Sequence, residues 1–579
     1  MRMAEVAGTF EALERTTSRT EITRILGQLF RQATGDEAGK LVYLLEGRLG
    51  PLFEPVEFGV DERLILRALA EATGLAPGQV EEVYRRTGDV GSAGEELLRG
   101  ESQGLSLADV YDALRAIAEA TGPGAQERKV RLLRGLLVRL GGNEARYVLR
   151  VVQGRLRLGV GEATVMDALS WAIVGHLELR ATIERAFNVC SDLGFVATVL
   201  LTEGPEALLA IQPRPGRPVR VELAERLPSP QAVVLKLGTV QAEPKYDGLR
   251  VELHKDGERI WLFTRRLEPM TETLPELASA ARRQIQARQA ILDGEAVAYN
   301  PETGEFRPFQ TTVRRKRKHA VEEMEVRFPL RLFVFDLLYL DGEDCTPYPL
   351  DQRRQKLEEA LRWTPDDPIQ PTPRVVTGDA AAVESFFEEM LQRGLEGLVV
   401  KRLDAPYQAG QRSFNWVKLK RGYRAELRDT VDVVVVGYLL GRGRRARLGI
   451  GSLLGAVYDP RTDRYRTVSK VGSGLTDEEW QELRARLDET RVPEKPRQVD
   501  SVIQPDVWVE PRYVVEVQAD EITRSPLHTC GKVDGHPGYA LRFPRVVRLR
   551  FDRRPQDATT EEEILGMYRA QPVARSSAA

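Results

Sequence analysis

A proline-rich stretch divides this chain into two parts with different hydrophobic periodicity. Residues 211–230, IQPRPGRPVRVELAERLPSP, contain five prolines and are typical of an extended linker. Before this stretch apolar residues recur at helical spacing, and after it they alternate with polar residues as in strands. The length of 579 residues allows about two to four domains. We therefore expect an all-helical part first and strand-rich parts after it.

Capping signals support the helical interpretation of the first part. Ser18 and Glu21 have the spacing of a capping box before an apolar face, and Gly35 is expected to end that helix. Ser106 and Asp109 repeat the same arrangement further along the chain. These signals predict helices over most of residues 1–210.

The pattern after the linker predicts an α+β part followed by a small β-barrel. Leu249, Val251 and Leu253 alternate with polar residues, and Asp256-Gly257 supplies the turn of a β-hairpin. Later strands are the apolar runs AILDGEAVAY, RLFVFDLLYLDG and EGLVVK, separated by helical segments such as AAVESFFEEMLQRG. From VDVVVVGYLLGRG onward the runs are short and punctuated by glycine, with one helix around TDEEWQELRARL.

Composition narrows the class of protein further. The 84 Lys and Arg residues nearly balance the 86 Asp and Glu residues, which excludes attachment to nucleic acid by bulk positive charge but not by local patches. The three cysteines are Cys190, Cys345 and Cys530, an odd and scattered set that fits a reducing compartment without disulfides. No apolar run approaches the roughly 20 residues that span a bilayer, and the N-terminus lacks a secretory segment. We expect a cytoplasmic protein that does not contact a membrane.

The segment AEPKYDGLRVELHKDG contains the most informative chemical motif. Lys245 lies beside a hairpin, with Asp247-Gly248 turning the chain behind it and with Glu243 and Arg250 as neighbours, as expected for a fixed nucleophile. The alternative is a surface lysine beside a turn. The same four-letter pattern recurs at Lys532, close to the C-terminus, so the motif alone does not decide.

The residues that follow Lys245 separate it from Lys532. After Lys532 fewer than 50 residues remain, and they hold only a basic segment. After Lys245 a series of charged and aromatic residues follows in order: Arg265 and Arg266 in LFTRRLEPMT, Glu295 in LDGEAVAY, Phe335 in FVFDLLYL, Glu396 and Lys401 in EGLVVK, Arg412 in YQAGQR, and Lys418 and Lys420 in WVKLK. Each element is weak by itself, but the ordered set is hard to obtain by chance.

With this set, the chain resembles ATP-dependent DNA ligases of the replicative archaeal and eukaryotic type, members of the covalent nucleotidyltransferase superfamily. The resemblance covers nearly the whole chain, including RYVLRVVQGRLRLGVGEATVMDAL in the helical part and LRFPRVVRLRFDRRPQDATT near the end. It implies a helical DNA-binding domain (residues 1–210), an adenylation domain (211–424), an OB-fold domain (425–556) and a C-terminal helix and tail (557–579). A lysine of such a ligase takes AMP from ATP and passes the AMP to a 5′-phosphate at a nick. The 3′-hydroxyl at the nick then displaces the AMP.

The resemblance also implies roles for individual residues. Lys245 would be the nucleophile, and because an unperturbed lysine has a pKa of about 10.4, such a nucleophile needs neighbouring cations or desolvation. Lys418, Lys420 and a divalent metal, Mg²⁺ or Mn²⁺, would supply that positive field. The remaining nucleotide and metal contacts implied by the resemblance are the following: Glu295 at the ribose and with Glu396 at the metal, Phe335 stacked on adenine, Glu243 accepting from the adenine amino group, and Arg250, Arg265 and Arg412 at ribose and phosphates.

Contacts to DNA phosphates are expected from several basic or glycine-containing segments. Gly159 and Gly161 precede an expected helix start, a geometry that presents backbone N–H groups to phosphate, although a plain helix–helix turn has the same pattern. The run RRKRK, residues 314–318, is either a solvated loop or a phosphate contact. Further phosphate or DNA candidates are Lys401, Lys420, Arg542 and Arg548.

Two other functions compete with this interpretation. An RNA ligase or a capping-type nucleotidyltransferase would share the chemistry but not the large helical N-terminal part. A catalytically silent DNA-binding clamp would have lost the nucleophile or the metal carboxylates, whereas Lys245, Glu295 and Glu396 are all present. We expect a monomer acting on nicked duplex DNA. The sequence leaves the preference among ATP, ADP and NAD open. It also leaves open a sliding clamp as partner, because we find no short motif that would bind one.

Overall fold

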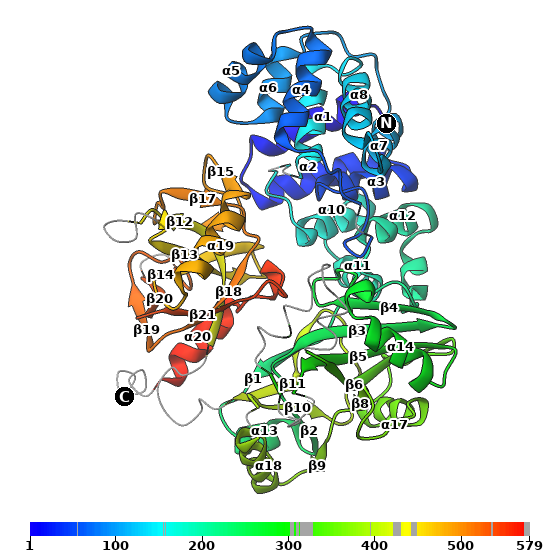
Figure 1. Ribbon diagram of the computed structural model, residues 1–579, viewed down its shortest axis with the longest axis vertical. Coiled ribbons are helices and arrows are strands. Elements are labelled where there is room, and N and C mark those ends of the chain that lie inside the picture. Colours follow the sequence, from blue (N-terminus) through cyan, green and yellow to red (C-terminus); the bar gives the residue numbers. More distant parts are fainter. Residues whose placement is uncertain are drawn as a thin grey trace. The chain divides into compact units, whose positions relative to one another are not determined.

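The protein divides into two compact units (Figure 1). The structure, a computed structural model, describes residues 1–54, 56–154, 156, 158–300, 306–307, 312, 328–393, 395–420, 430–441, 448–533 and 536–571. The first unit comprises residues 1–187 and 192–211, and the second comprises residues 188–191 and 212–579.

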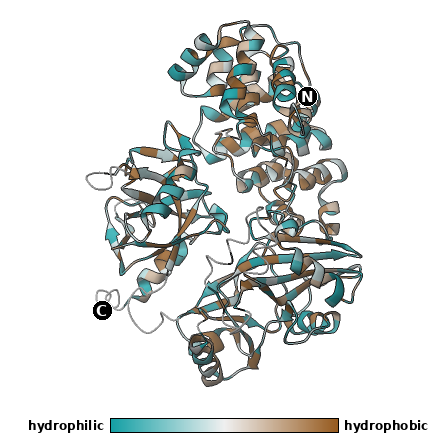
Figure 2. Cartoon of the chain, in the orientation of Figure 1, coloured by the Kyte–Doolittle hydropathy of each residue, from teal (hydrophilic) through white to brown (hydrophobic). Residues whose placement is uncertain are grey.

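The first unit is built from helices, as the sequence predicts. Figure 2 shows hydrophobic and hydrophilic residues on the same helices, the pattern of amphipathic helices that pack on a shared core. The helices are α1 (Met3–Glu14), α2 (Arg19–Gln32), α3 (Gly35–Leu45), α4 (Glu62–Thr73), α5 (Pro77–Thr87), α6 (Val90–Leu97), α7 (Leu107–Glu119), α8 (Ala125–Leu137), α9 (Gly142–Val152), α10 (Glu162–Val174), α11 (Arg180–Cys190), α12 (Leu193–Glu203) and the short η1 (Pro205–Ala210).

The two predicted N-terminal caps are present. The Ser18 side chain accepts a hydrogen bond from the backbone N–H of Glu21 at the start of α2. Ser106 and Asp109 form a reciprocal capping box at the start of α7.

The prediction that Gly35 ends a helix is wrong. α2 ends at Gln32, and Gly35 is instead the first residue of α3. Its lack of a side chain is needed for packing against α12, because a Cβ at Gly35 would lie 1.9 Å from Thr202 Oγ1 and one at Gly39 would lie 2.5 Å from Thr198 Oγ1. The glycine therefore allows two helices to approach closely.

The central part of the second unit contains two sheets with helices on their outer faces. One sheet has the order β1-β11-β10-β2-β9, and the other has the order β4-β3-β5-β6-β7 with β8 beside β6. The elements are β1 (Leu223–Arg226), α13 (Pro230–Leu237), β2 (Val240–Pro244), β3 (Leu249–Asp256), β4 (Arg259–Thr264), η2 (Thr271–Thr273), α14 (Pro275–Gln284), β5 (Gln289–Ala298), β6 (Leu330–Leu340), β7 (Glu343–Asp344), α17 (Leu350–Ala360), β8 (Ile369–Pro371), β9 (Val375–Thr377), α18 (Ala380–Gln392), β10 (Gly397–Arg402) and β11 (Arg412–Lys420).

Three apolar clusters hold these layers together. Helices α13 and α18 share one cluster with the first sheet, and α14 and α17 share another with the second sheet. The third cluster joins the two sheets and includes Ile291, Phe335 and Trp416. Residues on the inner face of the sheets therefore lie close to this third cluster, where the candidate site is found.

The predicted hairpin is confirmed, whereas the proline-rich segment is more than a linker. β3 and β4 pair antiparallel around Asp256-Gly257, and Gly257 has a φ of 58°, which suits glycine at such a turn. In the proline-rich segment, Val219 is fully buried and β1 pairs in parallel with β11. The segment is extended because it becomes an edge strand of the first sheet.

The C-terminal part of the second unit is mainly β-structure, again as predicted. Its long strand β12 pairs with β13, β17 and β18, and β18 also pairs with β21. The elements are β12 (Thr430–Leu439), β13 (Ser452–Asp459), β14 (Arg464–Val471), α19 (Asp477–Asp488), β15 (Arg491–Val492), β16 (Val499–Asp500), β17 (Val507–Val509), β18 (Val514–Gln518), β19 (Glu521–Ser525), β20 (Gly538–Arg542), β21 (Arg545–Leu549), η4 (Pro555–Asp557) and α20 (Glu561–Ala570).

Candidate active site

Lys245 lies next to Glu396, at the end of strand β2 where it meets strand β10. The Lys245 backbone N–H donates to Gly397 O at 2.8 Å, and the Glu396 N–H donates to Lys245 O at 3.3 Å. These bonds continue the antiparallel pairing of the two strands. The side chains meet with 2.5 Å between Lys245 Nζ and Glu396 Oε2, and both are about one-fifth exposed (19% and 21%).

The Glu396 carboxylate is shared by two further cations. Lys420 Nζ lies 3.5 Å from Oε2, and Arg548 Nη2 lies 3.3 Å from Oε1. Burial by itself would raise the pKa of Glu396, but Lys245, Lys420 and Arg548 hold that pKa well below its usual range. Burial lowers the pKa of Lys420. The arrangement therefore concentrates positive charge around Lys245.

A second buried ion pair lies deeper, between the two sheets. Glu243 Oε2 is 2.8 Å from Lys401 Nζ, and these side chains are 2% and 1% exposed. Gln241 Nε2 donates to the other oxygen of Glu243 at 2.6 Å. Lys401 Nζ also lies 4.3 Å from the centroid of the Phe335 ring and 4.1 Å from that of Trp416. This buried cluster thus combines aromatic rings, an acceptor and a cation.

Arg250 and Glu295 are cross-strand partners on β3 and β5, on the same side of the aromatic wall. Arg250 forms a bidentate pair with Asp293 at 2.6 and 2.5 Å, and its guanidinium lies 4.7 Å from the Phe335 centroid. Tyr407 donates its hydroxyl to the same Asp293 at 2.8 Å. Burial raises the pKa of Glu295 to about 7, against the opposing charges of Arg250 and Lys245. A carboxyl with that pKa can bind a cation when it is ionised and can donate a hydrogen bond when it is protonated.

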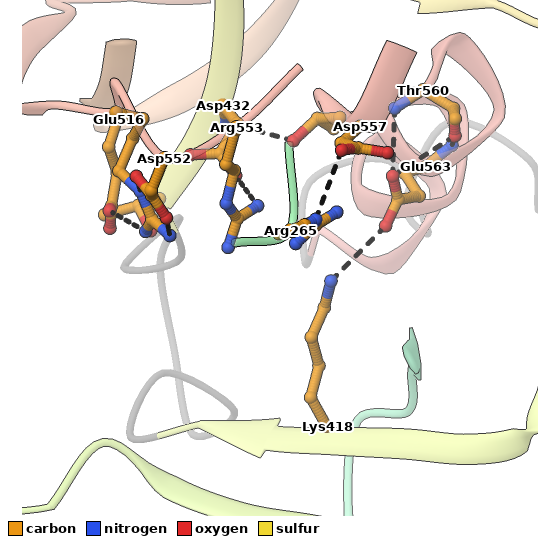
Figure 3. Close-up of polar contacts among 12 residues, drawn as sticks. Arg265, Lys418, Asp432, Glu516, Asp552, Arg553, Asp557, Thr560 and Glu563 are labelled. Atoms are coloured by element: carbon orange, nitrogen blue, oxygen red, sulfur yellow. Dashed lines mark hydrogen bonds and ion pairs between the residues drawn. The ribbon is translucent and has the colours of Figure 1, made fainter. Parts of the chain in front are cut away.

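The C-terminal part contributes Arg548 to this site. Arg548 Nη1 lies 2.6 Å from both carboxylate oxygens of Asp247, and its Nε donates to Glu516 at 2.6 Å. A second contact between these parts joins Arg265 Nε to Asp557 at 3.2 Å (Figure 3). Burial lowers the pKa of the Arg265 guanidinium to about 10.

Three cations converge on Glu563, a residue in the first turn of α20. Arg412 Nη1 forms an ion pair with Glu563 Oε1, Lys418 Nζ lies 3.6 Å from that oxygen, and Arg226 Nε lies 3.9 Å from it. Figure 3 shows the extended Lys418 side chain pointing at Glu563. Burial and the charge of Arg226 lower the pKa of Lys418 well below its usual range. This cluster of cations binds a carboxylate here and has the chemistry to bind a phosphate.

Comparison with known proteins assigns the chain to a family. Three family models match: DNA ligase N terminus at residues 2–170, ATP dependent DNA ligase domain at 221–420, and ATP dependent DNA ligase C terminal region at 446–553. A probable DNA ligase of Dictyoglomus thermophilum is 49% identical over 99% of this chain and 98% of its own length. The chain belongs to the ATP-dependent DNA ligase family.

Two further full-length relatives agree with this assignment. DNA ligase 2 of Thermofilum pendens is 44% identical over 98% of this chain and 97% of its own length, and a DNA ligase of Hyperthermus butylicus is 42% identical over 99% and 98%. A solved mycobacterial DNA ligase D complexed with ATP and MES is 24% identical over 59% of this chain and 97% of that chain, with a TM-score of 0.35. The ligase has the family's helical N-terminal, central adenylation and C-terminal β regions.

Most residues expected at the nucleotide site lie together in this ligase. Lys245 and Glu396 are in contact, and their surroundings contain the expected Glu243, Arg250, Glu295, Phe335, Lys418 and Lys420. Lys532 differs from Lys245 because its side chain is exposed, and the Asp534-Gly535 of its motif lies outside the described residues.

Some expected DNA contacts lie elsewhere. Lys401 is buried against Glu243, so it does not reach the surface in this structure. Arg542 is half-exposed, 4.0 Å from Glu521. Gly161 is the N-cap of α10 and Gly159 has a φ of 66°, as a turn before a helix requires. The basic run 314–318 lies outside the described residues.

Several residues of the site were not found by sequence reasoning. Asp247 stands inside the lysine motif and could have been proposed from its position two residues after Lys245. Asp293, Glu516 and Glu563 have no local signal, because their importance comes from partners that are distant in the sequence.

The side chains of the described part of the chain do not form a complete metal site by themselves. Among the described residues, no group of three or more His, Cys, Asp or Glu side chains could hold a metal ion. In the same part of the chain, no helix is long and apolar enough to cross a membrane.

Proposed function

We propose that this ligase seals nicks in duplex DNA through a covalent lysyl-AMP at Lys245. The observation that carries the proposal is the contact of Lys245 with Glu396 inside a cluster of cations, Lys420 and Arg548, that suits a polyphosphate. A nucleophilic lysine held beside such cations can attack a phosphorus atom whose oxygens they neutralise.

The reaction would proceed in three balanced displacements. The Lys245 amine forms a bond to the α-phosphorus of ATP, and the bond to the β-phosphate oxygen breaks to release pyrophosphate. The proton that the lysine loses passes to solvent, because the cations around Glu396 make that carboxylate a poor base. A 5′-phosphate oxygen at the nick then displaces the lysine from the AMP phosphorus. Finally the 3′-hydroxyl attacks the 5′-phosphorus, and AMP leaves.

The cluster of Glu243, Lys401 and Phe335 marks our proposed site for adenine and ribose. Phe335 supplies an aromatic wall, and Glu243 supplies an acceptor for the adenine amino group. Glu295 would bind the ribose. Arg250, Arg265 and Arg412 would contact ribose or phosphate, where a guanidinium can form two parallel hydrogen bonds.

A divalent cation, Mg²⁺ with Mn²⁺ as a substitute, fits the donors that are present. Glu295 has a desolvated carboxyl with a pKa of about 7, and Glu396 is a hard oxygen donor surrounded by cations. Two carboxylates and the phosphates of a substrate are a usual set for Mg²⁺, which agrees with the lack of a cage formed by side chains alone among the described residues. When bound, the ion would neutralise phosphate charge.

The C-terminal β region is proposed to be an OB-fold. Its first three strands, β12, β13 and β14, pair in order, and α19 follows them before the next pairing strand. This order, with a helix after the third strand and with β18 pairing back to β12, supports a small Greek-key barrel. We further propose a monomer that acts on nicked duplex DNA in the cytoplasm.

The experiment that tests this function is covalent labelling. The full chain is incubated with Mg²⁺ and α-labelled ATP, GTP or NAD, and the protein is examined for an acid-stable label. We expect label from ATP that is absent in Lys245→Ala and retained in Lys532→Ala, an exposed lysine of the same motif. No label from any nucleotide would contradict the proposal, and label from GTP alone would favour a capping enzyme.

A further inference from the structure

Glu516 is a buried carboxylate that two arginines share. Its Oε2 accepts from Arg548 Nε at 2.6 Å and from Arg550 Nη1 at 3.1 Å. The side chains of the three residues are between 6% and 9% exposed. Figure 3 shows Glu516 beside Asp552.

Strand register explains why these three side chains meet. Glu516 on β18 stands directly opposite Arg548 on β21, and opposite Asp432 on β12 on its other side. The pairing continues past β21, because the Arg550 N–H donates to Val514 O at 2.9 Å. Arg548 and Arg550 are two residues apart, so their side chains leave the same face of the sheet.

The two arginines use different edges of their guanidinium groups. Arg548 donates Nε to Glu516, within its own sheet, and turns both Nη atoms to Asp247 and Glu396 beside Lys245. Arg550 donates from Nε and Nη2 to Asp552, at 2.9 and 2.8 Å, and from Nη1 to Glu516. Only the Nη edge of Arg548 therefore faces the atoms that surround the nucleophile.

Charge explains why one carboxylate is needed between the two arginines. Adjacent guanidinium groups repel, and in a buried place that repulsion is weakly screened. Arg548 and Arg550, with Lys420, hold the pKa of Glu516 below its usual range although burial raises it. Without the negative charge of Glu516 the two cations would separate, and Arg548 would lose the anchor of its Nε edge.

We propose that Glu516 is a positioning residue for self-adenylation. It holds Arg548 beside Arg550 so that the Nη edge of Arg548 can exchange Asp247 and Glu396 for the phosphates of a nucleoside triphosphate. Carboxylate and phosphate oxygens accept the same bidentate hydrogen bonds, so phosphate oxygens can replace the carboxylates as acceptors of the Arg548 N–H groups. The inference rests on the proposed function, since it assigns Glu516 to the first displacement only.

The test compares two reactions of the full-length protein. The first is self-adenylation at a series of ATP concentrations, which needs the triphosphate. The second is the joining of a nick whose 5′-phosphate already carries AMP, which needs no ATP. The variants are Glu516→Gln, which keeps the shape and removes the charge, and Glu516→Asp, which keeps the charge.

A matched control is Glu482→Gln on the exposed helix α19. Glu482 also pairs with an arginine, Arg486, at 3.0 Å, but its side chain is 47% exposed. This variant is expected to behave as the wild type in both reactions, because exposed ion pairs contribute little.

We expect Glu516→Gln to raise the KM for ATP in self-adenylation roughly 10- to 100-fold, the loss that one charged hydrogen bond represents. Joining of the pre-adenylated nick should be unchanged, and Glu516→Asp should recover part of the ATP affinity. The inference is overturned if ATP dependence is unchanged, or if both reactions and the melting temperature fall together. If the wild type takes no label from ATP, the proposed function has failed instead.

Discussion

Glu396 and Glu516 each hold more than one cation in an environment where an unpaired charge is costly. Glu396 contacts Lys245, Lys420 and Arg548, and Glu516 contacts Arg548 and Arg550. Removing one partner of a buried pair leaves an uncompensated charge, which costs more than the pair itself contributes. At the scale of residues, the charges of this protein must therefore be considered as networks.

Arg353 and Asp336 offer a direct measure of that cost. Their side chains are both fully buried, and Arg353 donates Nε and Nη2 to Asp336 at 2.7 and 3.0 Å. We expect Arg353→Leu to reduce the free energy of unfolding by about 3–5 kcal/mol, because it leaves Asp336 buried without its partner. Urea unfolding followed by tryptophan fluorescence measures the change.

The control for this prediction is an exposed pair in the same unit. Arg402 and Asp404 lie 2.6 Å apart with side chains 48% and 70% exposed. Arg402→Leu should cost less than about 1 kcal/mol. Equal losses in the two variants would show that burial of the Arg353 pair has no special weight.

Glu222 makes the stability of the second unit depend on pH. Burial raises the pKa of the Glu222 carboxyl to about 7, with Asp336 also raising it and with the N–H of Gln408, Arg353 and Lys401 lowering it. The folded protein binds this proton more tightly than the unfolded chain does, so Glu222 stabilises the fold fully at a pH below the ordinary pKa of a glutamate. That stabilisation is lost as the pH rises through 7. The wild type should therefore lose up to roughly 3 kcal/mol between pH 5 and pH 8 from this group.

Thermal unfolding at several pH values tests this prediction. Glu222→Gln should lose less stability over that range than the wild type, because it lacks the titrating carboxyl of Glu222 while that of Glu295 remains. Glu388→Gln, an exposed glutamate on α18, should follow the wild type. If Glu222→Gln loses as much stability with rising pH as the wild type does, the prediction is wrong.

At the scale of elements, helix α20 belongs to the C-terminal part but presents a charge to the adenylation part. Ile564 lies in the core of the C-terminal part, and Glu561 pairs with Arg466 at 3.0 Å. Gln571, just after the helix, exchanges hydrogen bonds of 2.8 and 2.9 Å with the backbone of Ile522. The helix is thus firmly attached where Glu563 extends to Arg412.

Glu563→Gln should accelerate self-adenylation several-fold when ATP is below saturation. The carboxylate of Glu563 occupies Arg412 and Lys418, and a triphosphate must compete with it for those cations. The measurement is the initial rate of covalent labelling at low ATP. Glu562→Gln, the exposed neighbour on the same helix, is the control and should leave the rate unchanged. A slower rate in Glu563→Gln would mean that the contact assists adenylation.

At the scale of the whole molecule, a net charge of −2 conceals local concentrations of both signs. The sequence places basic residues close together near residues 418–421 and 542–554. In the structure Arg548, Arg550, Arg553 and Arg554 all have acidic partners nearby. Part of the cancellation is therefore local.

Nick binding should nevertheless depend strongly on salt. Cations that bind phosphates release counterions, so affinity falls as salt rises. Fluorescence anisotropy with a nicked duplex should show a loss of about tenfold or more between 50 and 200 mM salt. An affinity that does not change over this range would show that few phosphates are bound.

Deleting residues 1–205 should separate the chemistry from nick binding. Lys245 and the residues around it, including Arg548, belong to the second compact unit, so self-adenylation should persist. Nick binding should weaken severely, because the helical domain is expected to hold DNA. Sealing by the truncated protein at the rate of the full chain would contradict this role of the helices.

The sequence alone was enough for the order of the helical, α+β and β parts, the caps at Ser18 and Ser106 and the β3–β4 hairpin, and it made Lys245 the candidate nucleophile. These features depend on neighbouring residues, because hydrophobic period, capping and turn chemistry act over a few positions. The ordered motifs after Lys245 added the identity of many site residues, although not their contacts.

Only the tertiary structure decided which of those residues meet and which charges are buried. Strand register brought Glu396 to Lys245 and placed Glu516 between two arginines. It also buried Lys401, which local spacing had suggested as a DNA contact, and the approach of α12 gave Gly35 a different role from the one predicted. Burial and ion pairing depend on partners that are distant in sequence, and for that reason local patterns cannot specify them.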